Sequence, residues 1–171
     1  MPSPKIMDTT VLHGDEYYTL REDAEIIADN LVDRPLRIWC PFRDSNSVWV
    51  DVLQSRGHSV VATDTDFFRT SVPNGVDAIV SNPPFSLKYE ILVRIRDIGL
   101  HFALILPFLW LNDGVPFDFG NQLMLFRKRM FFNTPIGGKN KPRANCFVLS
   151  NGLLKRDFIV IRKECYGHDK R

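Results

Sequence analysis

An apolar run near the middle of the chain stops at residues whose types and order suit the binding of an amino group. Residues 77–81 are followed by Asn82-Pro83-Pro84-Phe85. The two prolines restrict the backbone, so we expect the Asn82 side-chain oxygen and the carbonyl groups after it to be fixed acceptors. Fixed acceptors beside an aromatic ring suit a planar group that carries an amine. The alternative is that this segment only ends a strand, because Asn-Pro and Pro-Pro are common in turns.

Polar and aromatic residues follow two other apolar runs in the same way. Pro41-Phe42-Arg43-Asp44 follows residues 36–40, and Asp64-Thr65-Asp66-Phe67 follows residues 59–63. In open α/β sheets, ligands bind beyond the carboxyl ends of the strands, near the point where the strand order reverses. We therefore expect all three segments to line one site. Phe67 and Phe68 are adjacent, so at most one of the two rings faces that site.

The elements that must position these segments alternate between helix and strand. Apolar residues at three- and four-residue intervals predict helices over 21–33, 47–56 and 88–98. Short apolar runs bounded by proline, glycine or polar residues predict buried strands over 36–40, 59–63, 77–81 and 102–106. This alternation predicts an α/β fold with a doubly wound, mostly parallel, Rossmann-like sheet. We expect a single domain over residues 1–171 that begins with an irregular segment at 1–20.

The last third of the chain is predicted to add a short helix and an antiparallel edge. The helix is predicted for 122–128, and a strand follows it at 129–132. Two further strands, 144–150 and 158–162, flank a turn at Asn151-Gly152. A turn of this type between two strands is typical of antiparallel pairing.

The net charge of +2 is divided unevenly along the chain. Residues 1–120 hold 10 Lys/Arg against 17 Asp/Glu, a net charge of −7, whereas residues 121–171 hold 12 against 3, a net charge of +9. A basic third attracts a polyanion such as nucleic acid to one side, although many basic surfaces are only solvated. The loop-rich stretch 111–143 is the candidate substrate-recognition region. Within it, the residues interpreted as phosphate contacts, rather than as a solvated loop, are Lys139, Lys141 and Arg143.

Composition and cysteine usage exclude several classes of protein. No apolar run approaches the roughly 20 residues that span a bilayer, and the N-terminus lacks the apolar stretch of a secretory signal. Cys40, Cys146 and Cys165 lack C-x-x-C spacing and indicate neither a disulfide framework nor a zinc site. The four histidines show no metal or triad spacing. We expect a protein of the reducing cytoplasm without a membrane or metal partner, and the sequence does not indicate its oligomeric state.

The segment Asn82-Pro83-Pro84-Phe85, which we call the corner at Asn82, also resembles a known signature. Ser81-Asn82-Pro83-Pro84-Phe85-Ser86 is similar to the Asn/Asp-Pro-Pro-aromatic motif of S-adenosylmethionine-dependent adenine-N6 methyltransferases. The resemblance extends over residues 17–150 in motif order. It is closest to small, often phage-encoded, DNA methyltransferases that read Trp-Cys-Pro-Phe where this chain has Trp39-Cys40-Pro41-Phe42. The fold that the resemblance implies is the Rossmann-like sheet predicted above.

The resemblance implies a role for each residue of the corner and names the substrate class. Asn82 and the carbonyl of Pro83 would accept hydrogen bonds from the N6 amine of adenine in DNA. Phe85 would stack on the base, and Pro84 completes the catalytic motif. A base within a duplex is buried, so the target must be unpaired or flipped out. The implied reaction is methyl transfer from S-adenosylmethionine.

The resemblance also implies a cofactor site at the other strand ends. Residues 41–44 would wrap the methionine part, Asp64 would hold the ribose hydroxyls, and Asp66 with Phe67 would meet the cofactor adenine. Tyr18-Thr19 stands in place of a Thr-Pro element that touches the cofactor. The implied cofactor-binding residues are Tyr18, Thr19, Pro41, Phe42, Asp44, Asp64, Asp66 and Phe67. From the residues alone, Asp64 can also cap a turn and Asp44 a helix.

Departures from the family pattern keep other functions open. Residues 43–47 contain no glycine where the family usually has Gly-x-Gly, and we expect no separate target-recognition domain within residues 1–171. One alternative is the same fold acting on RNA or on a protein glutamine, because these substrates also present a planar amino group. Another is a non-catalytic nucleic-acid-binding module with a degenerate cofactor site.

Overall fold

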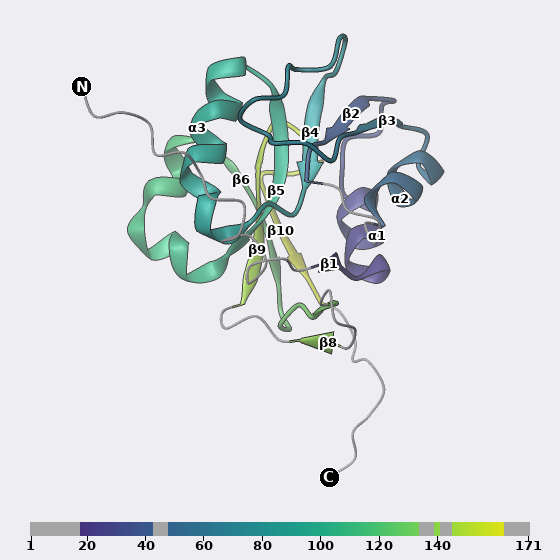
Figure 1. Cartoon of the computed structure of the whole chain (residues 1–171). Coiled ribbons are helices and arrows are strands. Elements are labelled where there is room, and N and C mark those ends of the chain that lie inside the picture. The colour runs from purple at the N-terminus through teal and green to yellow at the C-terminus, as the bar shows by residue number, and fades with distance from the viewer. Residues whose placement is uncertain (1–17, 43–47, 134–138, 141–144, 163–171) are drawn as a thin grey trace, which may run out of the picture.

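The main sheet of the protein has seven strands. The computed structural model describes residues 18–42, 48–133, 139–140 and 145–162, and within them the strand order is β10-β6-β9-β5-β4-β2-β3 (Figure 1). The strands are β2 (Arg37–Cys40), β3 (Ser59–Ala62), β4 (Ala78–Ser81), β5 (His101–Pro107), β6 (Gln122–Phe126), β9 (Cys146–Asn151) and β10 (Phe158–Ile161). Only β9 runs antiparallel to its neighbours, β5 and β6, and the other pairs are parallel. The carboxyl ends of the parallel strands therefore share one edge.

Helices cover both faces of this sheet. The α-helices are α1 (Arg21–Asp29), α2 (Trp49–Ser55) and α3 (Lys88–Ile98), and the 3-10 helices are η2 (Phe85–Leu87), η3 (Phe108–Asp113) and η4 (Val115–Asp118). Figure 1 shows α3 to the left of the strands and α1 with α2 to their right. No helix within the described ranges is both long and apolar enough to cross a membrane.

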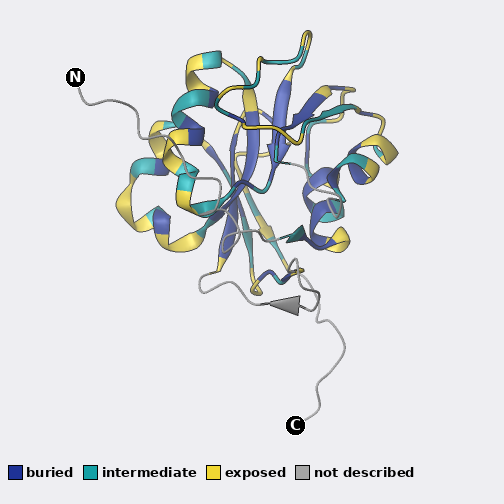
Figure 2. Ribbon diagram, viewed as in Figure 1, coloured by how far each residue is buried: buried dark blue, intermediate teal, exposed yellow. Residues whose placement is uncertain are grey.

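Two hydrophobic layers follow from the alternation of side chains along each strand. On β2, Ile38 and Cys40 join the apolar residues of α1 and α2, whereas Trp39 joins those of α3 and η3. Figure 2 shows the central strands buried between these helices. Strands that are covered on both faces read as continuous apolar runs, which is why β4 and β5 are recognisable in the sequence.

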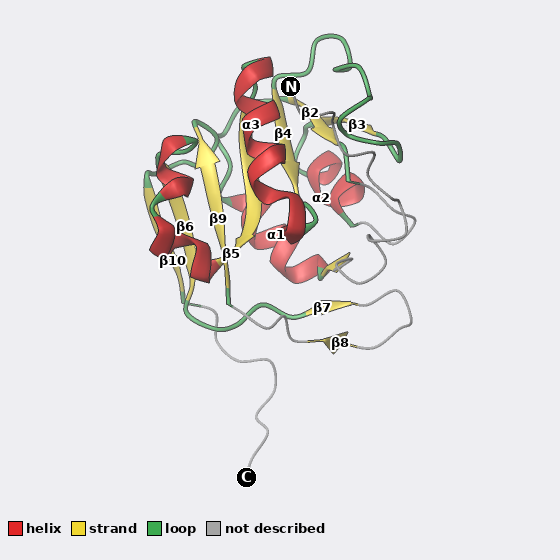
Figure 3. Cartoon of the chain, turned by 60° about the vertical axis from the view of Figure 1, so that its left-hand side comes forward, coloured by secondary structure: helices red, strands yellow, loops and turns green. Residues whose placement is uncertain are grey.

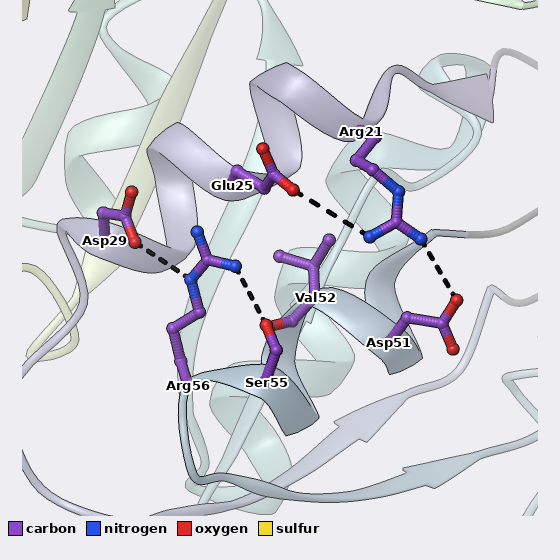
Figure 4. A network of polar contacts seen from close by, with 7 residues as sticks. All are labelled: Arg21, Glu25, Asp29, Asp51, Val52, Ser55 and Arg56. Carbon is purple, nitrogen blue, oxygen red and sulfur yellow. Dashed lines mark hydrogen bonds and ion pairs between the residues drawn. The ribbon is translucent and has the colours of Figure 1, made fainter.

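Exposed ion pairs join α1 to α2 on the outside of the hydrophobic layer that these helices cover (Figure 4). The Arg21 guanidinium lies 3.2 Å from the Asp51 carboxylate and 3.9 Å from that of Glu25. Arg56 Nε lies 2.9 Å from Asp29 Oδ1. Exposed pairs of this kind contribute at most about 1 kcal/mol each. The packing of the two helices on the sheet therefore depends mainly on their apolar residues.

A second, small sheet lies beyond the carboxyl ends of the parallel strands. It contains β1 (Tyr18–Thr19), β7 (Phe132–Asn133) and β8 (Lys139–Asn140), with antiparallel pairing throughout. Figures 1 and 3 both show this sheet below the end of β4. The segment before α1 and the segment after β6 are thus brought together at the same edge.

The structure confirms the mixed α/β fold and most elements up to residue 107. Helix α3 spans the predicted 88–98, and the predicted strands correspond to β2, β3, β4 and β5. The predicted helices over 21–33 and 47–56 are shorter, ending at Asp29 and Ser55.

Three predictions for the last third are wrong. Residues 122–128 form strand β6 instead of a helix, because Gln122–Phe126 pairs with β9 on one side and β10 on the other. The strands at 146–151 and 158–161 do not pair, since β6 lies between them and the edge strand β10 is parallel. Of the strand predicted over 129–132, only Phe132 lies in a strand, as the first residue of β7 (Phe132–Asn133). The loop-rich stretch 111–143 begins with two short 3-10 segments, the end of η3 and η4.

Candidate functional site

The strand order reverses between β2 and β4. The chain passes from β2 to β3 on one side and then returns to place β4 on the other side of β2. Near this point, the Cys40 thiol donates to the Val80 carbonyl at 3.4 Å and joins the two strands just before they end. Pro41 and Phe42 follow β2, and Asn82 follows β4. The residues predicted from these two strand ends therefore lie at the switch point, where doubly wound sheets bind ligands.

The amide of Asn82 does not present its oxygen to solvent. Asn82 is half-buried, and its Oδ1 is fully buried. The sequence predicts that this oxygen faces a ligand, and in the structure the oxygen is covered by protein atoms. An approaching amine can therefore reach this oxygen only after the Asn82 side chain or its surroundings move. The neighbouring Ser81 Oγ is buried without a hydrogen-bond partner among the described residues.

The corner after Asn82 is fixed by the first residue of α3. Pro83 is buried, and Pro84 is the N-cap of η2. Lys88 Nζ donates to the Phe85 carbonyl at 3.3 Å and lies 5.3 Å from the centre of the Trp110 ring. Phe85 itself is half-buried against the hydrophobic layer that includes α1 and α2. Phe85 therefore keeps part of its surface accessible.

The two predicted acidic residues, Asp64 and Asp66, both lie in the loop after β3, but only Asp66 is hydrogen-bonded within it. Asp64 is exposed, and its carboxylate has no hydrogen-bond or ion-pair partner among the described residues. Asp66 instead caps a turn, since its Oδ1 accepts from the Phe68 amide at 2.8 Å and its carbonyl accepts from the Thr70 amide at 2.9 Å. Asp64 is therefore the acid that is available to a ligand.

Phe67 belongs to the core and offers little surface to a cofactor. Its side chain is only 4% exposed. Its ring centre lies 5.4 Å from that of Trp39 and 5.0 Å from that of Phe42. The predicted contact of Phe67 with a cofactor adenine is therefore not supported. Phe68 is half-buried and is the ring of the pair that keeps accessible surface.

Three hydrogen bonds that the sequence does not predict hold this loop in place. Trp39 Nε1 donates to Thr63 Oγ1 at 3.1 Å. Arg94 donates from Nη1 to the Phe68 carbonyl at 2.5 Å and from Nη2 to the Thr70 carbonyl at 2.6 Å. A signal for Arg94 exists in the sequence, because it occupies the apolar face of α3, three residues after Ile91.

The predicted N-terminal cofactor residues lie in β1. Tyr18 pairs with Asn133 and Thr19 with Phe132 of β7. Thr19 is 5% exposed, and its Oγ1 has no hydrogen-bond partner among the described residues. A buried hydroxyl without a partner is uncommon in folded proteins and marks a position where a ligand atom or water can bind.

Part of the predicted site lies outside the described residues. Asp44, Lys141 and Arg143 belong to this part, whereas Lys139 lies in β8, paired with Asn133. Within the described chain, no group of three or more His, Cys, Asp or Glu residues is arranged to hold a metal ion.

The two cysteines of the described chain are suited to the core and not to nucleophilic chemistry. Cys40 and Cys146 are both buried. Burial raises the pKa of Cys146 to about 12, and the nearby Asp23 carboxylate acts in the same direction. A thiol of this kind remains protonated and unreactive near neutral pH.

Comparisons with known proteins do not assign the chain to a family. No family model matches the sequence, and no curated protein matches it. The functional interpretation therefore depends on the switch point between β2 and β4 and on the residues at its edge.

Proposed function

We propose that this chain transfers a methyl group from S-adenosylmethionine to the N6 amino group of adenine in DNA. The observation that carries the proposal is the position of Asn82-Pro83-Pro84-Phe85. These residues directly follow a central parallel strand, β4, beside the switch point of the sheet. A motif that resembles an amine-binding corner thus stands where folds of this class bind ligands.

The chain contributes position and hydrogen bonding to the proposed reaction. Once its oxygen is accessible, Asn82 would accept a hydrogen bond from the N6 amine together with the Pro83 carbonyl. The two acceptors would direct the lone pair of the amine at the methyl carbon. S-adenosylmethionine supplies an electrophilic methyl group on a sulfonium sulfur. As the new N–C bond forms, the C–S bond breaks and one amine proton passes to water. Catalysis of this kind relies on orientation and on fixed dipoles around the reacting atoms.

The β2–β3 side of the edge offers suitable groups for the cofactor. The exposed carboxylate of Asp64 suits the ribose hydroxyls, because an Asp or Glu performs this role in other doubly wound folds. The accessible part of Phe68 replaces Phe67 as the ring beside the cofactor adenine. The buried hydroxyl of Thr19 is a further acceptor and donor at the same edge of the sheet.

A transfer assay with an Asn82→Ala variant tests the proposal. Purified wild-type protein should transfer label from methyl-labelled S-adenosylmethionine to unmethylated DNA, with N6-methyladenine identified by nucleoside mass spectrometry. Asn82→Ala should lower the transfer rate by about a hundredfold or more, a loss typical of a preorganised hydrogen-bonding group at the reacting centre. Its dissociation constant for the cofactor should stay close to that of the wild type, because Asn82 acts on the substrate amine.

Asn74→Ala is the matched control, since Asn74 is an exposed asparagine in the loop that precedes β4. It should retain wild-type transfer. Wild-type rates in Asn82→Ala would refute the role of Asn82. RNA and protein extracts serve as parallel substrates, and label appearing only in one of these would assign the substrate to that class instead of DNA.

A second candidate function is nucleic-acid binding without catalysis. It is favoured by the burial of the Asn82 oxygen and of the Phe67 ring, and by the lack of glycine in residues 43–47. Calorimetric titration with S-adenosylmethionine separates the two candidates. Absence of binding at millimolar cofactor would favour the non-catalytic module.

A further inference from the structure

Four basic residues gather at the ends of two neighbouring strands. Arg127, Lys128 and Arg129 directly follow β6, and Arg162 directly follows β10. The Arg127 amide donates to the Ile161 carbonyl at 3.1 Å, which holds the two strand ends together. All four basic residues are exposed. We call this group the basic edge.

The basic edge lies on the same side of the sheet as Asn82. Strands β6 and β10 run parallel to β4, so their carboxyl ends point the same way. β6 stands three strand positions from β4, which corresponds to about 14 Å at a spacing of about 4.8 Å per strand. Figure 3 shows the segment after β6 running below the sheet toward β7.

A hydrogen-bond chain connects this segment to the strand beside β4. Arg129 Nε donates to Asn145 Oδ1 at 2.9 Å, and the Asn145 carbonyl accepts from the Phe108 amide at 2.6 Å. Phe108 is the first residue after β5, and β5 is the neighbour of β4. The basic edge is therefore held in a defined position relative to the corner at Asn82.

Positive and negative charges lie at opposite ends of the row of strand carboxyl ends. No acidic residue occurs in 122–133, 145–151 or 158–162, and within the described chain neither Arg127 nor Arg162 has an ion-pair partner. At the opposite end of the sheet, Asp64 and Asp66 follow β3. An anionic partner is thus attracted to the β6–β10 end and a cationic one to the β3 end.

We infer that the basic edge binds the sugar-phosphate backbone of the nucleic acid whose adenine enters the corner at Asn82. The inference rests on the proposed function and names residues outside the predicted contacts Lys139, Lys141 and Arg143. One strand of DNA advances about 3.4 Å per nucleotide, so a separation of about 14 Å places these contacts roughly four nucleotides from the target. The basic edge positions the nucleic acid and does not read its sequence, because phosphate contacts carry no base information.

The test compares two variants that each lose two positive charges. Arg127→Gln with Arg162→Gln removes two cations of the basic edge, neither of which has an ion-pair partner in the described chain. Lys155→Gln with Arg156→Gln removes two exposed cations just before β10, at the amino ends of the parallel strands. Dissociation constants for duplex DNA and for single-stranded RNA are measured by fluorescence anisotropy over a series of salt concentrations, and binding of S-adenosylmethionine is measured on the same preparations.

The first variant should bind duplex DNA about tenfold more weakly. Its plot of log affinity against log salt should be shallower by about 1.8 for duplex DNA and about 1.4 for single-stranded RNA, the values for two lost phosphate contacts. The control should keep the wild-type slope.

Equal slopes and affinities in the two variants would overturn the inference, as would a wild-type protein that binds neither nucleic acid. Tighter binding of RNA than of DNA, with the expected slope change, would assign the basic edge to an RNA backbone. Nucleic-acid binding with the expected slope change but no binding of S-adenosylmethionine would overturn the proposed methyl transfer alone.

Discussion

Arg94 holds the loop that carries Asp64. Its side chain lies on the apolar face of α3, where a cation is unfavourable unless its donors find acceptors. The two terminal nitrogens find them in the backbone carbonyls of Phe68 and Thr70, and the guanidinium packs over the Phe67 ring with Cζ 5.0 Å from the ring centre. Because Asp64 lies only a few residues before these contacts, its position depends on a side chain from another element.

Replacing Arg94 with lysine should loosen this loop. Lysine carries a single ammonium group in place of a planar fork, so it cannot span two carbonyl groups in the same way. Loss of one hydrogen bond from a charged donor weakens the local structure by about 1.5–3 kcal/mol. Amides of Arg69 and Thr70, which donate to the Asp66 carbonyl, should then exchange about tenfold faster or more. Hydrogen exchange of peptides covering residues 63–72 measures this change.

Arg96→Lys is the matched control for Arg94→Lys. Arg96 is exposed on the same helix, pairs with Asp97, and packs over Phe119 with Cζ 5.6 Å from the ring centre. It shares the helix and the aromatic contact with Arg94 but makes no bond to the 63–72 loop. Equal exchange in the two variants would mean that Arg94 does not restrain this loop.

The site residues that the sequence could predict are those whose position follows from a strand end. Asn82 and Asp64 are of this kind, since each lies next to a recognisable apolar run. The burial of Phe67 was not predictable, because it depends on Trp39 and Arg94, which are distant in the sequence. The orientation of the Asn82 oxygen likewise depends on packing around the finished sheet.

At the scale of elements, one buried glutamine joins β6 to the turn before β10. Gln122 Nε2 donates to the Leu154 carbonyl at 3.0 Å and to Asp157 Oδ1 at 3.2 Å. Its Oε1 accepts from the Leu154 amide at 2.9 Å and from Ser150 Oγ at 3.1 Å. Ser150 Oγ in turn accepts from the Leu153 amide at 3.2 Å. The amide therefore satisfies backbone groups that the turn leaves outside the sheet.

Gln122→Leu should lower the free energy of unfolding by about 2–4 kcal/mol. Leucine has a similar size but leaves the amide and carbonyl of Leu154 buried without partners, and each such group costs about 1–3 kcal/mol. Urea denaturation should show a lower midpoint with an unchanged m-value. Gln54→Leu, at an exposed position of α2, should change the free energy by no more than about 0.5 kcal/mol. Indistinguishable midpoints for the two variants would contradict the role of Gln122.

The elements that were predicted correctly carry their signal within their own residues. Helix α3 has eleven residues with a regular apolar face, so its limits are readable in the sequence. Strand β6 has only five residues, and a short apolar run is compatible with helix or strand. Its pairing with β9 and β10 is decided by strand partners that lie elsewhere in the chain. For the same reason, the turn at Asn151-Gly152 does not reveal that β6 lies between the last two strands, β9 and β10.

At the scale of the whole molecule, the basic third of the sequence is not one surface. Arg127 and Arg162 lie at the carboxyl edge with Asn82, whereas Lys155 and Arg156 lie at the opposite edge of the same strands. Parallel pairing of β6 and β10 produces this division, and a count of charges along the chain does not reveal it. Part of the positive charge is thereby placed beside the proposed site, and part of it is kept away.

The stability of the whole molecule should depend on pH through His58. His58 lies in the turn between α2 and β3. Its side chain is buried, and its Nδ1 accepts a hydrogen bond from the Leu36 amide at 3.2 Å, which requires the neutral ring. Burial lowers the pKa of His58 below its ordinary value of 6.5. The unfolded chain therefore binds a proton over a pH range in which the folded protein does not. Where the unfolded state binds more protons than the folded state, lowering the pH lowers the free energy of unfolding. The contribution of His58 is therefore complete above pH 6.5 and is lost as the pH falls below this value.

The variant His58→Asn isolates this contribution. The oxygen of asparagine can accept the bond from the Leu36 amide but does not take up a proton near neutral pH. Urea denaturation of both proteins between about pH 8 and pH 5 should show a larger loss of stability for the wild type, confined to the acidic part of this range. The other histidines are present in both proteins, so their titration cancels in the difference. The same pH dependence in both proteins would mean that the ring of His58 takes up a proton as readily in the folded protein as in the unfolded chain.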